Sequence, residues 1–551
     1  MKLPFLAAEE EDDDAVSDEP LEDEAETGVA EAPLHWGWTL AIAVGAALPR
    51  LLYLFALTDP ENPGERRYGD VWHHWQIAYL TQQIGLTAPD GPRLWDLKGL
   101  DYFWGILHPL LMVAIFDITG SIDIVLDRLV SIAFGVLVVV LLFHVCRRHW
   151  GTQVAAGAAL VATLLPTSVM NDASGMLEPI GVALCLLGIW AWPRRGGFWA
   201  GLAFGLATMA RAEAWIFSAG MVVAAFFRSS GRQQRIPLVV GFGIVMLTYM
   251  KVLSDKTGNA IYPLWWNFLA NAVGKWEFAP VSAAQASVRP VLGVALVGAA
   301  AGLAWSLWKR PPSYMLLTFG FGYWVFVAGM LGFTSYLASW VWWMPITRVF
   351  AFPYVFVGVL VAVVLLWWLP RRGAAGTRVG WVALGASLIA TQLLWVPIWQ
   401  EFSPSESEWK VALAESEQLG RWYHEPAYEG HSLAVPDDRP DVTYALARFA
   451  GVEGKHLVSE MYDPFAYLPS GYAYADHAGT VNTLLECWLK QTDTRLIAVP
   501  RGDPNYALMQ QQNPQWFTRL GTLDNAGWDV VGVAAPVPEA SECQAARAAT
   551  G

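Results

Sequence analysis

Asp70 is the side chain whose place in the sequence best suits it to chemistry. It stands in the stretch GERRYGDVWHHWQIAYL, at the start of a segment in which Trp72, Ile77, Tyr79 and Leu80 would form the apolar face of a helix. A carboxylate here can accept the proton of an attacking hydroxyl group, and partial removal from water would strengthen it as a general base. Aspartate is also a favoured N-cap of a helix. The local sequence therefore fits two interpretations, a general base and a cap.

Further ionisable residues stand beside long apolar segments. They are Asp172 and Glu178 in NDASGMLEPIG, Arg211 and Glu213 in MARAEAW, and Arg348 in WWMPITRVF. Ionisable side chains in such segments are costly, and they usually face a polar cavity or pair with one another. We therefore predict that these residues share a polar cavity, with salt-bridged helix packing as the alternative.

Two pairs of neighbouring residues could contact a ligand. His73 and His74 follow Asp70, and a helix would place Asp70 and His74 on one face. These two could hold a divalent metal ion, and polar residues at a membrane surface are the alternative. Trp265 and Trp266 lie in a long loop with amide side chains nearby. They suit contact with a sugar or a lipid as well as an aromatic belt at the membrane surface.

The elements that must position these residues are membrane-spanning helices. Of the 551 residues, 55% are hydrophobic and 15% charged, whereas a soluble domain has about 25% charged residues. A helix needs about 20 apolar residues to cross a bilayer. The predicted spans are 36–57, 122–146, 151–169, 175–192, 198–210, 213–227, 236–253, 290–308, 313–333, 341–369 and 379–399. The predicted fold is thus mainly α, a polytopic membrane helical bundle of about eleven spans, in which 102–119 is an interfacial or re-entrant helix.

Basic residues in the loops predict the orientation of the bundle. Arginine and lysine gather in five short loops, at 147–148, 194–195, 228–235, 309–310 and 371–378. Short loops rich in these residues stay in the cytoplasm. The same orientation places residues 1–34 in the cytoplasm, as an acidic tail too poor in apolar residues to fold.

The chain then divides into the tail, a membrane module and an outer domain. The transmembrane module, 35–400, has two long outer loops, 58–121 and 254–289. An odd number of spans places residues 401–551 on the extracytoplasmic side. Short apolar runs such as LAV, HLV and LIAV alternate there with helix-like stretches, which predicts a small extracytoplasmic α/β domain. The protein is expected in the inner or plasma membrane of the cell.

The order of these features resembles the GT-C superfamily of membrane glycosyltransferases, which includes protein O-mannosyltransferases and the aminoarabinose transferases of lipid A. The resemblance covers roughly residues 36–400. The matching features are Asp70 in the first outer loop, His108 before a proline, Arg128 near the start of the second span, Glu178 before a proline, and Arg211 with Glu213 after a glycine-rich segment. The Asp-Glu pair of the O-mannosyltransferases and the WWDYG motif of oligosaccharyltransferases are missing. This favours a bacterial-type transferase with a single-sugar donor.

The resemblance implies a reaction. A sugar would move from a polyprenyl-phosphate donor to a hydroxyl group of a glycan, lipid or protein on the outer face, with inversion at the anomeric carbon. Asp70 would be the general base, and Glu178 would orient the acceptor or be a second acid. Arg211, Arg348 and His108 would bind the donor phosphate, since arginine can contact phosphate through two hydrogen bonds at once. The acceptor or the sugar would contact His73, His74, Asp172, Glu213, Trp265 and Trp266.

Other ligands and functions are less favoured by the sequence. It holds no glycine-rich phosphate-binding motif, so neither a nucleotide cofactor nor a nucleic acid is expected. A divalent metal is the one cofactor that these residues could hold. A transporter or flippase of lipid-linked or sugar substrates is the alternative function. It predicts two related halves, and the sequence shows no such symmetry.

Overall fold

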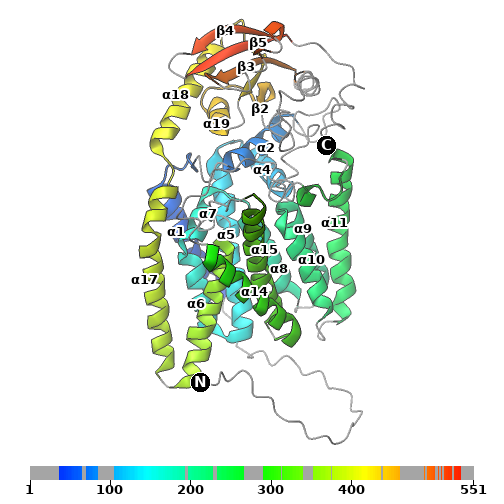
Figure 1. Cartoon of the computed structure of the whole chain (residues 1–551), viewed down its shortest axis with the longest axis vertical. Coiled ribbons are helices and arrows are strands. Elements are labelled where there is room, and N and C mark those ends of the chain that lie inside the picture. Colours follow the sequence, from blue (N-terminus) through cyan, green and yellow to red (C-terminus); the bar gives the residue numbers. More distant parts are fainter. Residues whose placement is uncertain are drawn as a thin grey trace, which may run out of the picture.

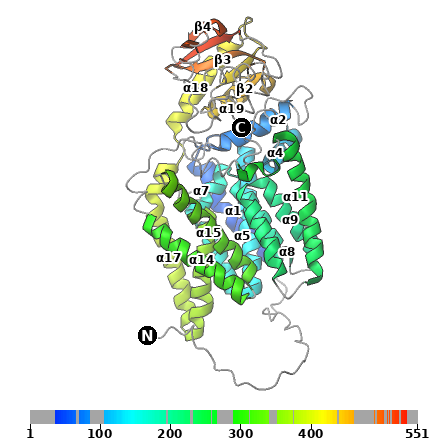
Figure 2. The ribbon, with the colours of Figure 1, turned by 45° about the vertical axis from the view of Figure 1, so that its right-hand side comes forward.

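The computed structural model describes most of the chain. The described residues are 36–64, 70–84, 105–192, 196–227, 232–257, 259–265, 289–311, 313–338, 351–373, 375–435, 439–459, 489, 493–502, 507, 510–511, 514–523 and 527–534. They form an elongated molecule with a bundle of helices at one end and a small sheet at the other (Figure 1). Two helices of the first outer loop, α2 (Asp70–Ile84) and α4 (Leu107–Thr119), lie between these parts (Figure 2).

Within the described residues, five helical segments are long and apolar enough to cross a membrane, or six if one bent pair counts as a span. They are α1 (Trp36–Leu52) continued by η1 (Tyr53–Leu57), α5 (Ile124–Trp150), α11 (Arg235–Thr257), α16 (Ala351–Val363) continued by η4 (Val364–Trp368) and η5 (Leu369–Arg372), and α17 (Gly376–Phe402). Large apolar side chains, for example Leu48 and Leu393, are exposed on α1 and α17. Such surfaces avoid water when they face lipid tails. The chain is therefore an integral membrane protein.

Three neighbouring helices are shorter than the bilayer is thick. α8 (Glu178–Ala191), α9 (Gly197–Ala210) and α10 (Glu213–Phe226) have 14 residues each. Each is therefore about 21 Å long, against roughly 30 Å of hydrocarbon. α9 packs closely on α11, because a Cβ on Gly201 would lie only 2.1 Å from the carbonyl oxygen of Leu238.

The last pair of bundle helices is α14 (Arg289–Lys309) and α15 (Tyr314–Ala338), which pack against each other. Each predicted span thus contains a helix, while the number of crossings, about eleven, stays a prediction.

The predicted span at 151–169 is broken in the middle. The chain forms α6 (Thr152–Leu164) and α7 (Pro166–Ser174), which meet at an angle of 58°. Pro166 breaks the helix, because it has no N–H group to donate and its ring collides with the carbonyl group four residues earlier. The carbonyl groups left open by the break need other donors.

Arg50 of α1 is the donor for this break. Its Nη2 and Nη1 donate to the carbonyl oxygens of Ala162 and Thr163 at 3.3 and 3.4 Å, and its Nε donates to Asp172 Oδ2 at 2.8 Å. The Arg50 and Asp172 side chains are each 1% exposed. Gly135 of α5 leaves room for them, since a Cβ there would lie 2.1 Å from Asp172 Oδ2. One ion pair therefore joins α1, α5, α6 and α7.

Removal of one member of this pair should destabilise the fold. We expect Arg50→Met or Asp172→Asn to lower the free energy of unfolding by about 3–5 kcal/mol, because the remaining charge is buried without its partner. The double variant should lose less than the sum of the two single losses. Thermal unfolding of the detergent-solubilised protein measures this, and strictly additive losses would show that the two charges are not coupled.

The first outer loop begins a helix at Asp70, as predicted. α2 is covered on more than one face, since Trp72, Trp75 and Tyr79 are all buried. The indole Nε1 of Trp75 donates to the carbonyl oxygen of Ile122 at 2.6 Å, which ties α2 to the chain just before α5. α4 packs against α2, so the two form one layer over the bundle.

The C-terminal part contains a mixed five-stranded sheet, as expected for an α/β domain. Its strands follow the order β2-β1-β3-β5-β4, in which β1 is parallel to β2 and β3, and β5 is antiparallel to β3 and β4. The strands are β1 (Ser432–Val435), β2 (Leu457–Ser459), β3 (Thr494–Pro500), β4 (Phe517–Leu523) and β5 (Trp528–Val533). The accompanying helical elements are α18 (Glu406–Tyr423), α19 (Pro440–Arg448), η6 (Gly454–His456) and η9 (Pro514–Trp516). We call this unit, from α18 to β5, the outer domain, after the location that the sequence predicts for it.

Candidate functional site

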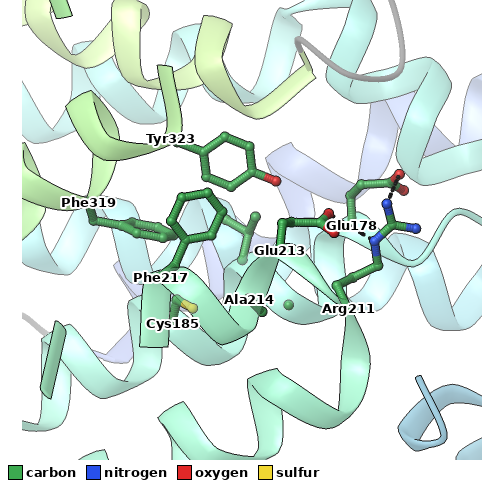
Figure 3. Close-up of a pocket in the computed structure, with 10 residues that line it drawn as sticks. Glu178, Cys185, Arg211, Glu213, Ala214, Phe217, Phe319 and Tyr323 are labelled. Atoms are coloured by element: carbon green, nitrogen blue, oxygen red, sulfur yellow. Dashed lines mark hydrogen bonds and ion pairs between the residues drawn. The ribbon is translucent and has the colours of Figure 1, made fainter. Parts of the chain in front are cut away.

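A small pocket opens where α8, α9 and α10 meet α15 (Figure 3). It is narrow, with room for about one water molecule in this structure. The lining residues are Glu178, Gly181, Val182, Cys185, Arg211, Glu213, Ala214, Phe217, Phe319 and Tyr323. A cation, two carboxylates and three aromatic rings thus surround one space in the membrane module.

Arg211 joins the two carboxylates of the pocket. Its Nε donates to Glu213 Oε1 at 2.9 Å, and its Nη2 lies 3.3 Å from Glu178 Oε1. The three side chains are largely buried. The third nitrogen, Nη1, is also buried, and it has no hydrogen-bond partner among the residues that the structure describes. Arg211 therefore keeps one nitrogen that can donate to a ligand.

Local structure explains why these residues meet. Arg211 ends α9 with extended backbone (φ −151°, ψ 145°), and the chain turns directly into α10, which begins at Glu213. Glu178 begins α8. Acids in the first turn of a helix are favoured by the helix dipole. Both glutamates therefore also stabilise the helices that they begin. The turn is closed by Trp215, whose Nε1 donates to the carbonyl oxygen of Thr208 at 2.8 Å.

An aromatic wall faces the charged residues. The rings of Phe217 and Tyr323 are stacked, with centroids 4.5 Å apart and planes at 16°, and Phe319 meets Phe217 edge-on. The Tyr323 hydroxyl points toward the carboxylates (Figure 3). Sequence reasoning does not single out these rings, because aromatic residues are common throughout the apolar spans. Only the packing of α15 on α10 separates a ring that lines the pocket from one that faces lipid.

The start of α2, with Asp70, lies against the turn that leads into the pocket. Gly175 lies in the turn between α7 and α8 with φ +90°, a conformation suited to glycine. A Cβ on Gly175 would lie 3.0 Å from Cγ1 of Val71. Since Gly175 precedes Glu178 by three residues, the first outer loop and a pocket acid approach the same turn.

Arg128 fixes the start of the first outer loop. It is fully buried, and its Nη1 donates to the carbonyl oxygens of Asp59 and Pro60 at 2.8 and 2.9 Å. Its Nη2 donates to Thr58 Oγ1 at 3.1 Å, and its Nε donates to the carbonyl oxygen of Ala173 at 2.7 Å. The chain leaving η1 is therefore held against α7. The resemblance pointed to this arginine, but its anchoring role becomes visible only in three dimensions.

His108 lies in a buried group of polar residues between α2, α4 and α5. Its Nε2 is 2.8 Å from Asp127 Oδ1, and its ring centroid is 5.6 Å from that of His74. His108, Asp127 and His74 are at most 2% exposed, while His73 on α2 is half-buried. In the described part of the chain, no three His, Cys, Asp or Glu side chains are arranged to hold a metal ion. A metal held by Asp70 and His74 is the less favoured of the two sequence interpretations, and it is untested.

The other predicted site residues are dispersed. Asp172 pairs with Arg50, so in this structure its carboxylate serves the helix break. Trp265 is 47% exposed in a short helical turn after α11. Arg348 and Trp266 lie outside the described residues. The structure therefore brings together Glu178, Arg211 and Glu213 from the predicted set, and their roles toward a substrate stay predictions.

Comparison with known proteins finds solved structures that are similar to this chain. No protein-family model matches the chain, and no curated protein matches it in sequence. A similar structure is the archaeal oligosaccharyltransferase AglB from Archaeoglobus fulgidus in complex with an inhibitory peptide and a dolichol-phosphate, with TM-score 0.47 and 13% identity, covering 84% of this chain and 69% of that one. Another is ArnT from Cupriavidus metallidurans bound to undecaprenyl phosphate, with TM-score 0.42 and 14% identity, covering 92% of this chain and 100% of that one.

A third similar structure is the arabinofuranosyltransferase AftD from Mycobacteria. Its TM-score is 0.45 at 11% identity, and the match covers 92% of this chain and 40% of that one. At these identities the likeness concerns the arrangement of the helices.

Proposed function

We propose that this chain is a membrane glycosyltransferase that moves a sugar from a polyprenyl-phosphate donor to an acceptor hydroxyl group on the outer face of the membrane. The observation that carries the proposal is the meeting of Arg211, Glu178 and Glu213 beside an aromatic wall. A guanidinium group suits a phosphate. Carboxylates can accept hydrogen bonds from sugar hydroxyls, and an aromatic face can cover the apolar side of a sugar ring.

The position of the pocket suits a donor that is carried by a lipid. The pocket lies at the ends of helices about 21 Å long, within a module whose longer helices cross the membrane. A polyprenyl tail can therefore stay in the bilayer while its phosphate and sugar enter from the side. The basic inner loops support an outer location of the reaction, with the N-terminus in the cytoplasm and the outer domain on the extracytoplasmic side.

The proposed step is a direct displacement. The acceptor oxygen attacks the anomeric carbon, and the bond between that carbon and the phosphate oxygen breaks. The oxygen keeps the bonding electrons and leaves as part of a phosphate monoester, while Asp70 takes the proton of the acceptor. One attack from the opposite side inverts the anomeric carbon. Glu178 would orient the acceptor or act as the second acid.

The leaving phosphate gains negative charge, so it needs donors aimed at it. Arg211 can offer Nη1, because its other two nitrogens are already bonded to Glu213 and Glu178. His108 can offer Nδ1, which has no partner among the described residues, while Nε2 is held by Asp127. Arg348 completes the proposed set. Two carboxylates on one guanidinium leave a formal charge of −1, so Arg211 alone is a weak anion site.

The remaining substrate contacts are proposed for the acceptor and the sugar. Glu213 would bind sugar hydroxyls from the pocket, and His73 and His74 would approach the acceptor from α2. Asp172 would join them only if its bond to Arg50 opened. Trp265 and Trp266 would contact the sugar or the lipid, and the acceptor would be a glycan, a lipid or a protein.

Mass spectrometry of glycans and glycolipids tests the proposal. Cells without the gene should lack one sugar residue on an outer-surface product, and they should accumulate the matching polyprenyl-phosphate sugar. Complementation with the wild-type gene should restore the residue. An unchanged set of glycans, with substrate accumulated on one side of the membrane, would overturn the proposal in favour of a transporter or flippase.

A further inference from the structure

The helix that begins at Asp70 is packed against the outer domain by aromatic rings. Trp72 is stacked on Trp409 of α18, with ring centroids 5.3 Å apart and planes at 26°, and it also touches Tyr444 of α19 at 5.1 Å. Trp75 meets Tyr444 edge-on at 4.8 Å. All four rings are at most 5% exposed. The contact is therefore a continuous buried cluster.

The second half of α2 is joined to the same domain by a hydrogen bond between a backbone N–H group and a side chain. The N–H group of Gly454 in η6 donates to the hydroxyl oxygen of Tyr79 at 3.0 Å. A Cβ on Gly454 would lie 2.7 Å from the Tyr79 ring, so only glycine allows this approach. Contacts near both ends of α2 thus restrain its rotation and its height above the bundle.

The chain before α2 is held by the outer domain as well. Asn62 Nδ2 donates to the carbonyl oxygen of Ser405, the N-cap residue of α18, at 3.2 Å. Arg448 of α19 lies 3.7 Å from Glu61 and 3.6 Å from Asp123. Burial raises the pKa of the Glu61 carboxyl group, Asp123 raises it further, and Arg448 opposes the rise.

Tyr444 occupies the centre of this interface. Its hydroxyl oxygen accepts from the backbone N–H group of Ile124 at 3.3 Å, next to the start of α5. Burial raises the pKa of the Tyr444 hydroxyl group above its usual range, so the group stays neutral. One side chain of the outer domain therefore touches both α2 and the first turn of a membrane-spanning helix.

We propose that the outer domain positions Asp70, and that Tyr444 and Trp409 are the positioning residues that set the placement of α2. This inference rests on the proposed role of Asp70 as general base. A helix transmits a rotation at one point to its whole length, and a misplacement of about 1 Å in a reacting group can cost on the order of 10²-fold in rate. The outer domain is thus part of the active-site framework, in addition to any contact it makes with an acceptor.

The test uses the full-length protein in detergent. Its donor is a solvent extract of lipid-linked sugars from cells that lack the gene. Tyr444→Leu and Trp409→Leu should each lower the maximal transfer rate per folded molecule by about 10- to 100-fold. The extract concentration at half-maximal rate should change by less than about twofold, since the donor pocket is untouched. Tyr444→Phe keeps the ring contacts and should retain at least about a third of the rate.

Trp422→Leu is the matched control. Trp422 lies on α18 like Trp409, but it stacks on Tyr428 within the outer domain, with centroids 4.1 Å apart. Its replacement should destabilise the domain without changing the rate per folded molecule. An equal loss of rate in Trp422→Leu and Tyr444→Leu would overturn the inference, and so would a wild-type rate in Tyr444→Leu.

Hydrogen exchange in α2 separates this inference from the proposed function. Backbone amides of α2 should exchange faster in Tyr444→Leu than in the wild type or in Trp422→Leu. If the amides of α2 exchanged faster in Tyr444→Leu but the sugar-transfer rate were unchanged, the positioning role would be wrong. The proposed transferase function would be unaffected by that result. Full activity of Asp70→Asn would remove the proposed base, and the positioning role with it, whatever the exchange shows.

Discussion

Asp70→Asn should reduce the rate of sugar transfer by about 10²- to 10⁴-fold, the range that a positioned general base contributes. Asparagine has nearly the same shape as aspartate and can still accept hydrogen bonds in the first turn of α2, but it cannot accept the acceptor's proton. The loss should therefore appear in the maximal rate, with little change in thermal stability. The measurement is the initial rate with the extracted lipid-linked donor, normalised to folded protein.

Asp117→Asn is the control for this substitution. Asp117 lies on α4 in the same outer loop, it is exposed, and its Oδ1 accepts from Gln82 Nε2 at 2.6 Å. It undergoes the same change of charge outside the proposed site and should keep the wild-type rate. If Asp70→Asn and Asp117→Asn were equally active, Asp70 would have only a structural role in the first turn of α2.

Arg211→Gln should reduce transfer by about 10²- to 10³-fold, the effect expected when one preorganised donor to a developing negative charge is lost. The substitution also leaves Glu178 and Glu213 close together without their cation, so it should lower the melting temperature. Arg211→Lys keeps the charge but not the planar fork, and it should fall between glutamine and the wild type. Initial rates and thermal unfolding of the same preparations give both quantities.

A double variant separates the two effects of Arg211. Arg211→Gln/Glu213→Gln removes one carboxylate together with the guanidinium group and should recover much of the lost stability. The transfer rate should stay low, because the donor to the phosphate is still missing. Recovery of the rate along with stability would mean that Arg211 serves only to hold α8 and α10 together.

The sequence predicts the helices of this fold well, because hydrophobic length is a direct signal. The segment 36–57 coincides with α1 and η1, and 198–210 and 213–227 coincide with α9 and α10 to within a residue. The break at Pro166 was readable in principle, since proline ends a helix. The residues on both sides of Pro166 are apolar, so the hydropathy pattern predicts one continuous segment.

The candidate site is predictable only where charge marks it. Glu178, Arg211 and Glu213 stand out as ionisable residues among apolar ones, and they do lie together. Tyr323 lies beside them, on a helix more than a hundred residues later in the chain. No local sequence pattern predicts that contact. His108 is similar, because its bond to Asp127 follows from the packing of α4 on α5. Side chains that meet only through tertiary packing show no periodic pattern in the sequence.

The hydrogen bonds of Arg50 constrain the order in which the membrane module can assemble. Its partners Ala162, Thr163 and Asp172 follow it by 112 to 122 residues. A nascent α1 has none of them, and an arginine in an isolated apolar helix costs about 2.5–3.5 kcal/mol near the bilayer centre. We therefore expect the newly made α1 to stay near the interface or inside the insertion machinery until α6 and α7 have been synthesised. Its final depth in the membrane is settled by a later part of the chain.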